Sequence, residues 1–304
     1  MKIVFSPCVV LVCAAFTLMT QLSAQADTFG GGTSNEFTVD FVSISQTNNT
    51  ADTTGYGAVP YNYRVGRYEI SQLQVTKATQ IGMANVSAGA WTGSQPAADI
   101  TWYEAAAFVN FLNTNSGKTA AYNLTFSNSQ WTMAVWSSEQ AWTAGGTNLY
   151  RNKDAFYFLP SENEWYKAAY FNPAGSNYFL YPTASSSVPT AVYDRAASVP
   201  STVDSAGGLS PYGTTGQGGN VFEWNESAFG GANSSASDVR ARRGGAWDSD
   251  GVSLRSSVRD GNVPTLEGNF IGFRVASVPE PSTYALLLMA GAGWLLWKRR
   301  KASL

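Results

Sequence analysis

Gly219-Asn220-Val221-Phe222-Glu223-Trp224 and Arg243-Gly244-Gly245-Ala246-Trp247 are the two segments that say most about the fold of this chain. The whole sequence shares their composition, since it contains 29 glycines and 13% aromatic residues. Charged residues also make up 13%, about half of the share that is usual in globular domains. This composition predicts an irregular, loop-rich fold held together by aromatic packing, and it argues against a helical bundle.

Three helix starts lie upstream of these segments. Ser71-Gln72-Leu73-Gln74, Thr101-Trp102-Tyr103-Glu104 and Ser161-Glu162-Asn163-Glu164 each place a hydroxyl residue three positions before Glu or Gln. In this capping box the two side chains satisfy free backbone N–H groups at a helix N-terminus. The second helix has the clearest apolar face, and Asn115-Ser116-Gly117 ends it. The residues of that face are Ala105, Phe108, Val109 and Leu112.

Strands are predicted before the helices, and a long irregular segment follows them. Phe37, Val39 and Phe41 alternate as in a strand, and residues 61–70 predict a second strand. Residues 172–219 are rich in Pro, Gly, Ser and Thr and are too long for a simple connector. We expect this segment to be either an ordered, functional loop system or a flexible surface.

The chain begins like a secretory signal peptide. Lys2 is followed by an apolar run from Val4 to Leu22 and by the small-residue site Ala24-Gln25-Ala26. This order predicts a signal peptide over residues 1–26 that is cut after Ala26. The alternative is an uncleaved anchor or a buried core segment.

The last residues combine Pro279-Glu280-Pro281, an apolar stretch from Tyr284 to Trp297, and the basic cluster Lys298-Arg299-Arg300-Lys301. The stretch is short for a permanent membrane helix, which needs about 20 apolar residues. The basic cluster is expected on the cytoplasmic side. This order resembles the PEP-CTERM sorting signal of Gram-negative bacteria, in which Pro279, Glu280 and Pro281 would be the sorting residues. The resemblance implies an exosortase as partner, transient membrane anchoring, and a place at the cell surface or outside the cell after processing. An ordinary anchor would give the same topology.

Residue counts exclude several kinds of chemistry. The chain has no histidine, and its two cysteines, Cys8 and Cys13, lie in the predicted signal peptide. The exported part therefore has no route to a disulfide, thiol catalysis, Ser-His-Asp hydrolysis or His-bound zinc or iron. Without Lys2, the four basic tail residues and Glu280, the totals of 19 basic and 21 acidic residues leave a net charge near −6. Nucleic acid is not an expected partner of such an acidic domain.

Six segments resemble, in order and spacing, the formylglycine-generating (sulfatase-modifying factor) family over about residues 60–276. Each segment alone is weak, because glycine and tryptophan recur in many proteins, but all six occur in one order. They are Val65-Gly66-Arg67-Tyr68-Glu69-Ile70, Ile100-Thr101-Trp102-Tyr103-Glu104-Ala105-Ala106, Leu159-Pro160-Ser161-Glu162-Asn163-Glu164-Trp165, the two segments quoted first, and Ile271-Gly272-Phe273-Arg274-Val275. The resemblance implies an α+β, irregular, loop-rich C-type-lectin-like domain with about three short helices and small antiparallel sheets.

The enzyme that names this family oxidises a substrate cysteine with a copper ion held by two of its own cysteines. The resemblance places these two positions at about Ser249 and Leu254, and the usual serine of the motif is Ala246. Neither a hydroxyl nor an isobutyl group replaces a thiolate pair for Cu(I). We therefore expect no copper and no catalytic residue. The histidine-bound iron of the related sulfoxide synthases is excluded as well, because the chain lacks histidine.

Calcium is a separate question, because its ligands are oxygens. The resemblance implies a calcium site of backbone carbonyls and one carboxylate, which correspond here to Gly219, Val221 and Glu223. An Asp or Asn is a usual further ligand, and Gly216 takes its position. The alternative is that Glu223 pairs with a nearby arginine and binds no metal.

The last stretch of the domain is rich in arginine and acidic residues. One interpretation is a set of ion pairs that hold irregular loops in place. In lectin-like members of the family, including retroelement-diversified variable proteins, this segment displays ligand-binding side chains, which implies a binding surface here. Trp and Arg are common at binding hot spots, although Trp247 is equally compatible with a core position. The implied binding residues are Trp247, Asp248, Asp250, Arg255, Arg259 and Asn262.

The predicted organisation has four parts. These are the signal peptide over residues 1–26, an N-terminal lead with the first strand over 27–59, the sulfatase-modifying-factor-like domain over 60–277, with 36–277 as the folded unit, and the sorting tail over 278–304. The leading hypothesis is an exported surface or matrix protein that binds a polysaccharide or protein ligand without catalysis. The alternatives are a divergent formylglycine-generating oxidoreductase acting on exported sulfatases, and a matrix component without a specific ligand.

Overall fold

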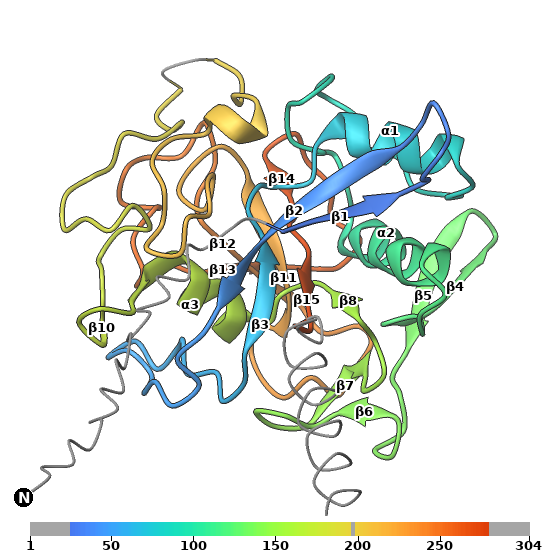
Figure 1. Ribbon diagram of the computed structural model, residues 1–304, viewed down its shortest axis with the longest axis horizontal. Coiled ribbons are helices and arrows are strands. Elements are labelled where there is room, and N and C mark those ends of the chain that lie inside the picture. The colour runs from blue at the N-terminus through green and yellow to red at the C-terminus, as the bar shows by residue number, and fades with distance from the viewer. Residues whose placement is uncertain (1–24, 196–197, 280–304) are drawn as a thin grey trace, which may run out of the picture.

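The computed structural model describes residues 25–195 and 198–279. Within these residues three α-helices and several small sheets are joined by long loops (Figure 1). The helices are α1 (Gln72–Gln80), α2 (Trp102–Asn115) and α3 (Glu162–Tyr170), and a 3-10 turn spans Val203–Ser205. All three predicted capping boxes are present, at Ser71, Thr101 and Ser161, so the predicted helix starts are confirmed.

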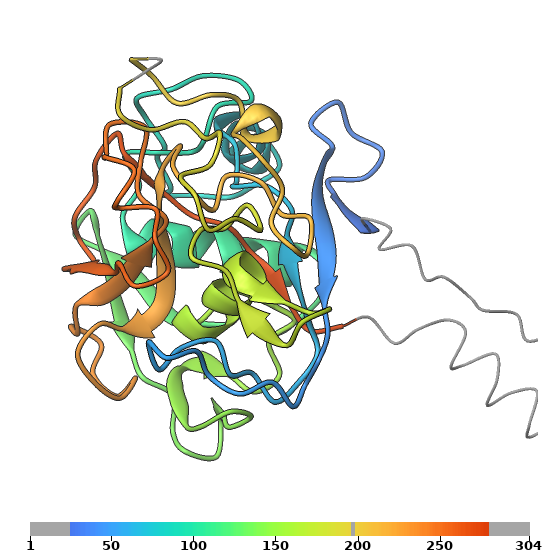
Figure 2. The same ribbon diagram turned by 90° about the vertical axis from the view of Figure 1, so that its left-hand side faces the viewer.

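A five-stranded antiparallel sheet forms the centre of the domain. Its strands are β1 (Gln25–Phe29), β2 (Phe37–Ile44), β3 (Tyr63–Gly66), β15 (Ala276–Ser277) and β8 (Tyr157–Phe158), in that spatial order. The first and last strands of the described chain therefore belong to one sheet, and Figure 2 shows them on the same side of the molecule.

The alternation along β2 explains why both faces of this sheet are covered. Phe37, Val39 and Phe41 pack into the main core with apolar residues of α1 and α2. Val42 and Ile44 instead join a smaller apolar cluster that contains Ala168 of α3. The sheet consequently lies between α1 and α2 on one face and α3 on the other.

The structure differs from the sequence-based expectation at β3 and β1. Residues 61–70 were expected to form one strand with alternating faces, but β3 covers only Tyr63–Gly66 and all four residues are buried. Arg64 is buried because it pairs with Asp27 of β1, with N–O distances of 2.9 and 2.6 Å, and lies 4.5 Å from the centre of the Phe41 ring. The N-terminal segment thus contributes the strand β1, which the sequence pattern did not predict.

A second sheet has the spatial order β13-β12-β11-β14 and includes the end of the segment 219–224 and the start of the segment 243–247. Its strands are β11 (Phe222–Ala228), β12 (Arg240–Arg243), β13 (Asp260–Asn262) and β14 (Ile271–Gly272). Three two-stranded hairpins complete the strands. They pair β4 (Asn123–Ser127) with β5 (Gln130–Ala134), β6 (Ala141–Trp142) with β7 (Asn148–Asn152), and β9 (Phe171–Asn172) with β10 (Asn177–Tyr178).

The irregular segment after α3 is tied to the rest of the domain by backbone hydrogen bonds. The N–H groups of Asp194 and Arg195 donate to the carbonyls of Ser249 and Trp247, at 2.7 and 2.8 Å. The described part of this segment therefore matches the ordered-loop alternative. No helix within the described ranges is long and apolar enough to span a membrane. Residues 1–24, Glu280, Pro281 and the apolar tail lie outside the described residues, and Pro279 is the last described residue.

Candidate functional site

Glu223, the predicted calcium carboxylate, is buried near the start of β11 and paired with Arg274. Arg274 Nε donates to Oε2 at 2.5 Å and Nη2 to Oε1 at 2.6 Å, while Trp165 Nε1 donates to Oε2 at 2.7 Å. Both carboxylate oxygens are thus used by strong donors of the fold. This arrangement is the arginine-paired alternative, in which both oxygens of the carboxylate accept hydrogen bonds from protein donors. Calcium at Gly219, Val221 and Glu223 stays a prediction from resemblance.

Glu69, which the sequence did not single out, is a second buried carboxyl beside this pair. Its Oε2 accepts a hydrogen bond from Asn220 Nδ2 at 2.7 Å, and its Oε1 has no partner among the described residues. Burial raises the pKa of Glu69 well above its usual range, and the nearby charge of Glu223 adds to the effect. Gly216 makes room for Glu69, because a Cβ at Gly216 would lie 2.8 Å from Oε2.

The two positions where the resemblance places the copper thiolates have structural roles here. Ser249 Oγ accepts a hydrogen bond from the N–H of Ala246 at 3.0 Å and so stabilises a turn. Leu254 is fully buried, and its Cδ1 lies 3.0 Å from where a Cβ on Gly245 would stand. Tyr170 donates from its hydroxyl to the Leu254 carbonyl at 3.2 Å. One position therefore shapes the loop, and the other fills the core.

Four of the six predicted ligand-binding residues lie in the same loop, residues 244–256. Trp247 is partly exposed, and its ring meets that of Trp91 edge to face, with 6.0 Å between the ring centres. Asp250 Oδ1 accepts hydrogen bonds from the N–H and hydroxyl of Ser253, which lowers the pKa of Asp250.

The polar side chains of this loop differ in whether they form hydrogen bonds within the domain. Arg255 Nε donates to the hydroxyl of Tyr181 at 3.0 Å. Within the described residues, the buried Nε1 of Trp247 has no acceptor, and the carboxylate of Asp248 forms no hydrogen bond or ion pair. The loop therefore keeps polar groups that the fold does not use.

The remaining two predicted residues lie apart from this loop. Arg259 Nε and Nη2 each donate to Glu162 at 2.7 Å, and its guanidinium carbon lies 4.0 Å from the centre of the Phe229 ring. Asn262 lies in the edge strand β13, opposite Arg240. The structure thus uses Arg259 as an ion-pair partner within the domain, in line with the structural interpretation of the arginine-rich stretch.

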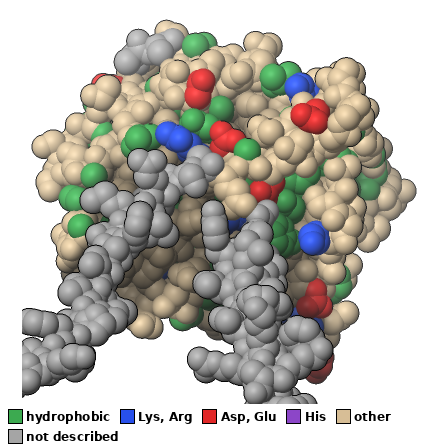
Figure 3. All heavy atoms as spheres, in the orientation of Figure 1, with side chains coloured by type: hydrophobic (Ala, Val, Ile, Leu, Met, Phe, Trp, Pro, Cys, Tyr) green, Lys and Arg blue, Asp and Glu red, His purple; other side chains and the backbone are tan. Residues whose placement is uncertain are grey.

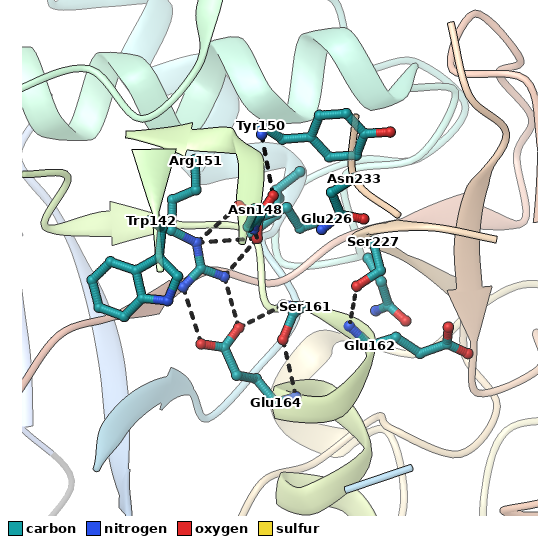
Figure 4. A network of polar contacts seen from close by, with 12 residues as sticks. Trp142, Asn148, Tyr150, Arg151, Ser161, Glu162, Glu164, Glu226, Ser227 and Asn233 are labelled. Atoms are coloured by element: carbon teal, nitrogen blue, oxygen red, sulfur yellow. Dashed lines mark hydrogen bonds and ion pairs between the residues drawn. The ribbon is translucent and has the colours of Figure 1, made fainter. Parts of the chain in front are cut away.

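A buried charge network that the sequence analysis did not predict joins β7, α3 and β11 (Figure 4). Arg151 Nη2 lies 2.8 Å from Glu164 Oε2 and 2.6 Å from Glu226 Oε2. Burial raises the pKa of Glu226. Burial alone would also raise the pKa of Glu164, but the charge and hydrogen bonds of Arg151 outweigh it and lower this pKa. No local motif could have revealed the network, because its three members come from distant segments.

Comparisons with known proteins agree with this structure. Residues 30–278 match the Sulfatase-modifying factor enzyme 1-like domain, and residues 277–301 match the PEP-CTERM protein-sorting motif. The sorting motif marks an exported protein that an exosortase processes and that is directed to the cell surface. A search of curated proteins found no match.

Several solved structures are similar to this chain. Treponema denticola variable protein 1 aligns with a TM-score of 0.60 and 20% identity, over 84% of this chain and 100% of that protein. CarF aligns at 0.55 and 19%, over 80% and 99%, and PvdO from Pseudomonas aeruginosa at 0.53 and 16%, over 84% and 100%. At these identities the likeness shows the fold alone, and it confirms the expected α+β, C-type-lectin-like class. The chain belongs to the sulfatase-modifying factor enzyme 1-like family and carries a PEP-CTERM sorting motif.

Proposed function

We propose that the exported chain is a non-catalytic ligand-binding protein of the cell surface or extracellular matrix. This proposal rests on the roles that the side chains of loop 244–256 have in the structure. At the positions where the resemblance places the copper thiolates, Ser249 stabilises a turn and Leu254 fills the core, while Trp247 and Asp248 stay partly exposed. We further propose that the sorting tail anchors the chain in the membrane transiently, in a Gram-negative bacterium, until the exosortase acts.

The ligand surface of this proposal consists of Trp91, Trp247, Asp248, Asp250 and Arg255. Partly exposed tryptophans with polar groups beside them are typical of binding hot spots, because the rings supply apolar area and the neighbouring side chains supply hydrogen-bonding groups. The charges of this surface are of both signs. On the face shown in Figure 3, charged side chains stand mostly singly among neutral ones. A polysaccharide or a protein with few charges fits such a surface.

The binding proposal is tested with the exported chain on a glycan array and in pull-downs from the surface fraction of the producing cells. We expect a retained ligand, and we expect Trp247→Ala to weaken its binding at least about tenfold, as hot-spot truncations do. Phe126→Ala is the control, because Phe126 is a 38% exposed aromatic residue on a separate hairpin. No retained partner at high protein concentration, or equal binding by Trp247→Ala, would contradict the proposal.

The absence of catalysis is tested separately. The exported chain is incubated with copper, oxygen and a sulfatase-motif peptide, and an aldehyde-specific hydrazide reports the product. We expect no aldehyde above the protein-free background, while a copper-loaded oxidase of the family gives a clear yield in parallel. A clear yield from this chain would instead support the divergent oxidoreductase.

A further inference from the structure

A polar cavity of about 210 Å³ lies beside the Arg151 network, away from loop 244–256. It is bounded by the turn between β6 and β7, the start of α3 and the residues after β11. Trp142, Ser161, Ser227 and Asn233, which all line it, are drawn in Figure 4. This site could not be predicted from the sequence, because its walls come from separate segments.

Four polar side chains on the wall have their oxygen atoms committed to the fold. Each oxygen accepts a hydrogen bond from a backbone N–H. The pairs are Ser161 Oγ with Glu164 N at 3.3 Å, Asn163 Oδ1 with Gly57 N at 3.0 Å, Ser227 Oγ with Glu162 N at 2.9 Å, and Asn233 Oδ1 with Ala228 N at 2.8 Å.

The hydrogen-bond donors of the same four side chains are not committed. A hydroxyl carries one donor hydrogen and a primary amide carries two. Within the described part of the chain, neither the hydroxyls of Ser161 and Ser227 nor the amide groups of Asn163 and Asn233 donate to a protein acceptor. The cavity wall therefore favours a ligand with several acceptor oxygens.

The charges around the cavity balance, so a charged ligand would gain no net attraction. Three carboxylates lie next to the wall, and three arginines neutralise them. Arg151 pairs with Glu164 and Glu226, whereas Arg243 and Arg259 both pair with Glu162. Because transfer of an unpaired charge out of water is costly, a neutral ligand is favoured over a carboxylate or phosphate.

Two aromatic residues complete the wall. Tyr61 and Trp142 are partly exposed and meet edge to face, with 5.4 Å between their ring centres. Such rings pack against C–H surface. The volume is below the roughly 300–1,000 Å³ of pockets for drug-sized ligands, so the occupant is small. We propose that this cavity binds a single neutral sugar residue, whose oxygens accept from the two serines and two asparagines while its C–H face lies against Trp142 and Tyr61.

The test uses the exported chain and ligand-observed NMR titration. The probes are methyl glycosides of neutral hexoses and N-acetylhexosamines, the corresponding hexuronates, and a neutral capped tripeptide. We expect at least one neutral glycoside to bind and its uronate to bind more weakly. Asn163→Asp and Asn233→Asp keep the oxygen that the backbone needs and remove the donor. Each should weaken binding about two- to tenfold, since that is the contribution of a neutral hydrogen bond to affinity.

Controls separate this site from loop 244–256. Asn128→Asp adds the same charge at the exposed turn after β4 and should bind like the parent. Trp247 does not line the cavity, so Trp247→Ala shows which of the two sites a glycoside uses. Glycoside binding that is lost in Trp247→Ala but kept in both Asp variants would belong to loop 244–256 and overturn this proposal. Melting temperatures show that the variants fold, and either Asp variant alone suffices. Absence of glycoside binding, tighter binding of the uronate or the tripeptide, or unchanged binding by the folded Asp variants would each overturn the proposal.

Discussion

At the residue scale, buried arginines connect distant segments of the chain, as disulfides do in other exported proteins. Arg64, Arg151, Arg243 and Arg274 are each at most 2% exposed, and each pairs with a carboxylate from a different part of the chain. Breaking such a pair leaves an uncompensated charge in a medium of low polarity. The pairs therefore fix which irregular segments lie side by side, as a covalent bridge would.

Lys167 is the contrasting residue, because it is buried on α3 without an ion-pair partner among the described residues. Its Nζ donates to the carbonyl of Gln46 at 2.9 Å, and burial lowers the pKa of Lys167 from 10.5 to about 8. Between these two values the unfolded chain binds more protons than the folded one. The free energy of unfolding that this group controls therefore rises with pH across that window.

Lys167→Met should consequently be more stabilising at pH 7 than at pH 10. We expect its advantage in free energy of unfolding over the parent to shrink by about 1–3 kcal/mol, since one pKa unit corresponds to about 1.4 kcal/mol. Urea unfolding of both proteins at a series of pH values measures the difference. A difference that stays constant from pH 7 to pH 10 would show that Lys167 is not desolvated in the folded chain.

At the scale of secondary-structure elements, local signals predicted the starts of the three helices and the strand β2, but not the length of β3 or the presence of β1. A capping box depends on residues three positions apart, so Ser71, Thr101 and Ser161 could be found in the sequence. The length of β3 and the presence of β1 depend instead on strands that are distant in the sequence. The Arg64 side chain is polar, and its bonds to Asp27 and to Ser277 Oγ make a fully buried strand possible.

The Arg151 network joins three elements, so we expect removal of its cation to lower the free energy of unfolding strongly. Arg151→Met leaves Glu164 and Glu226 buried without their cation, so we expect a loss of about 3–5 kcal/mol in free energy of unfolding by urea denaturation. Arg255→Ala, which removes a partly exposed arginine of loop 244–256, should cost less than about 1 kcal/mol. Replacing Glu164 and Glu226 by leucine in the Arg151→Met background should recover part of the loss. A loss below about 1 kcal/mol for Arg151→Met alone would contradict this role.

At the scale of the whole molecule, the order of the six family segments identified the fold, but it could not place the binding groups. Loop 244–256 was found because its residues are consecutive. Arg259 was assigned to that surface because it is near in sequence, although its actual neighbours are Glu162 and Phe229. The sugar cavity was missed for the opposite reason, since Tyr61, Trp142, Asn163 and Asn233 approach one another only in the folded chain.

Cleavage of the signal peptide can be followed by counting the thiols of the exported chain. Both cysteines precede Ala26, so a chain cut after Ala26 should contain no thiol, and its melting temperature should be the same with and without a reducing agent. Such a cut removes Gln25 and Ala26 from β1 but leaves Asp27, whose bond to Arg64 still holds the strand to the sheet. Thiol titration of the exported, denatured protein measures the count. Two thiols per chain would show that the apolar N-terminal segment is retained as an anchor, and the ligand surfaces would then work next to a membrane.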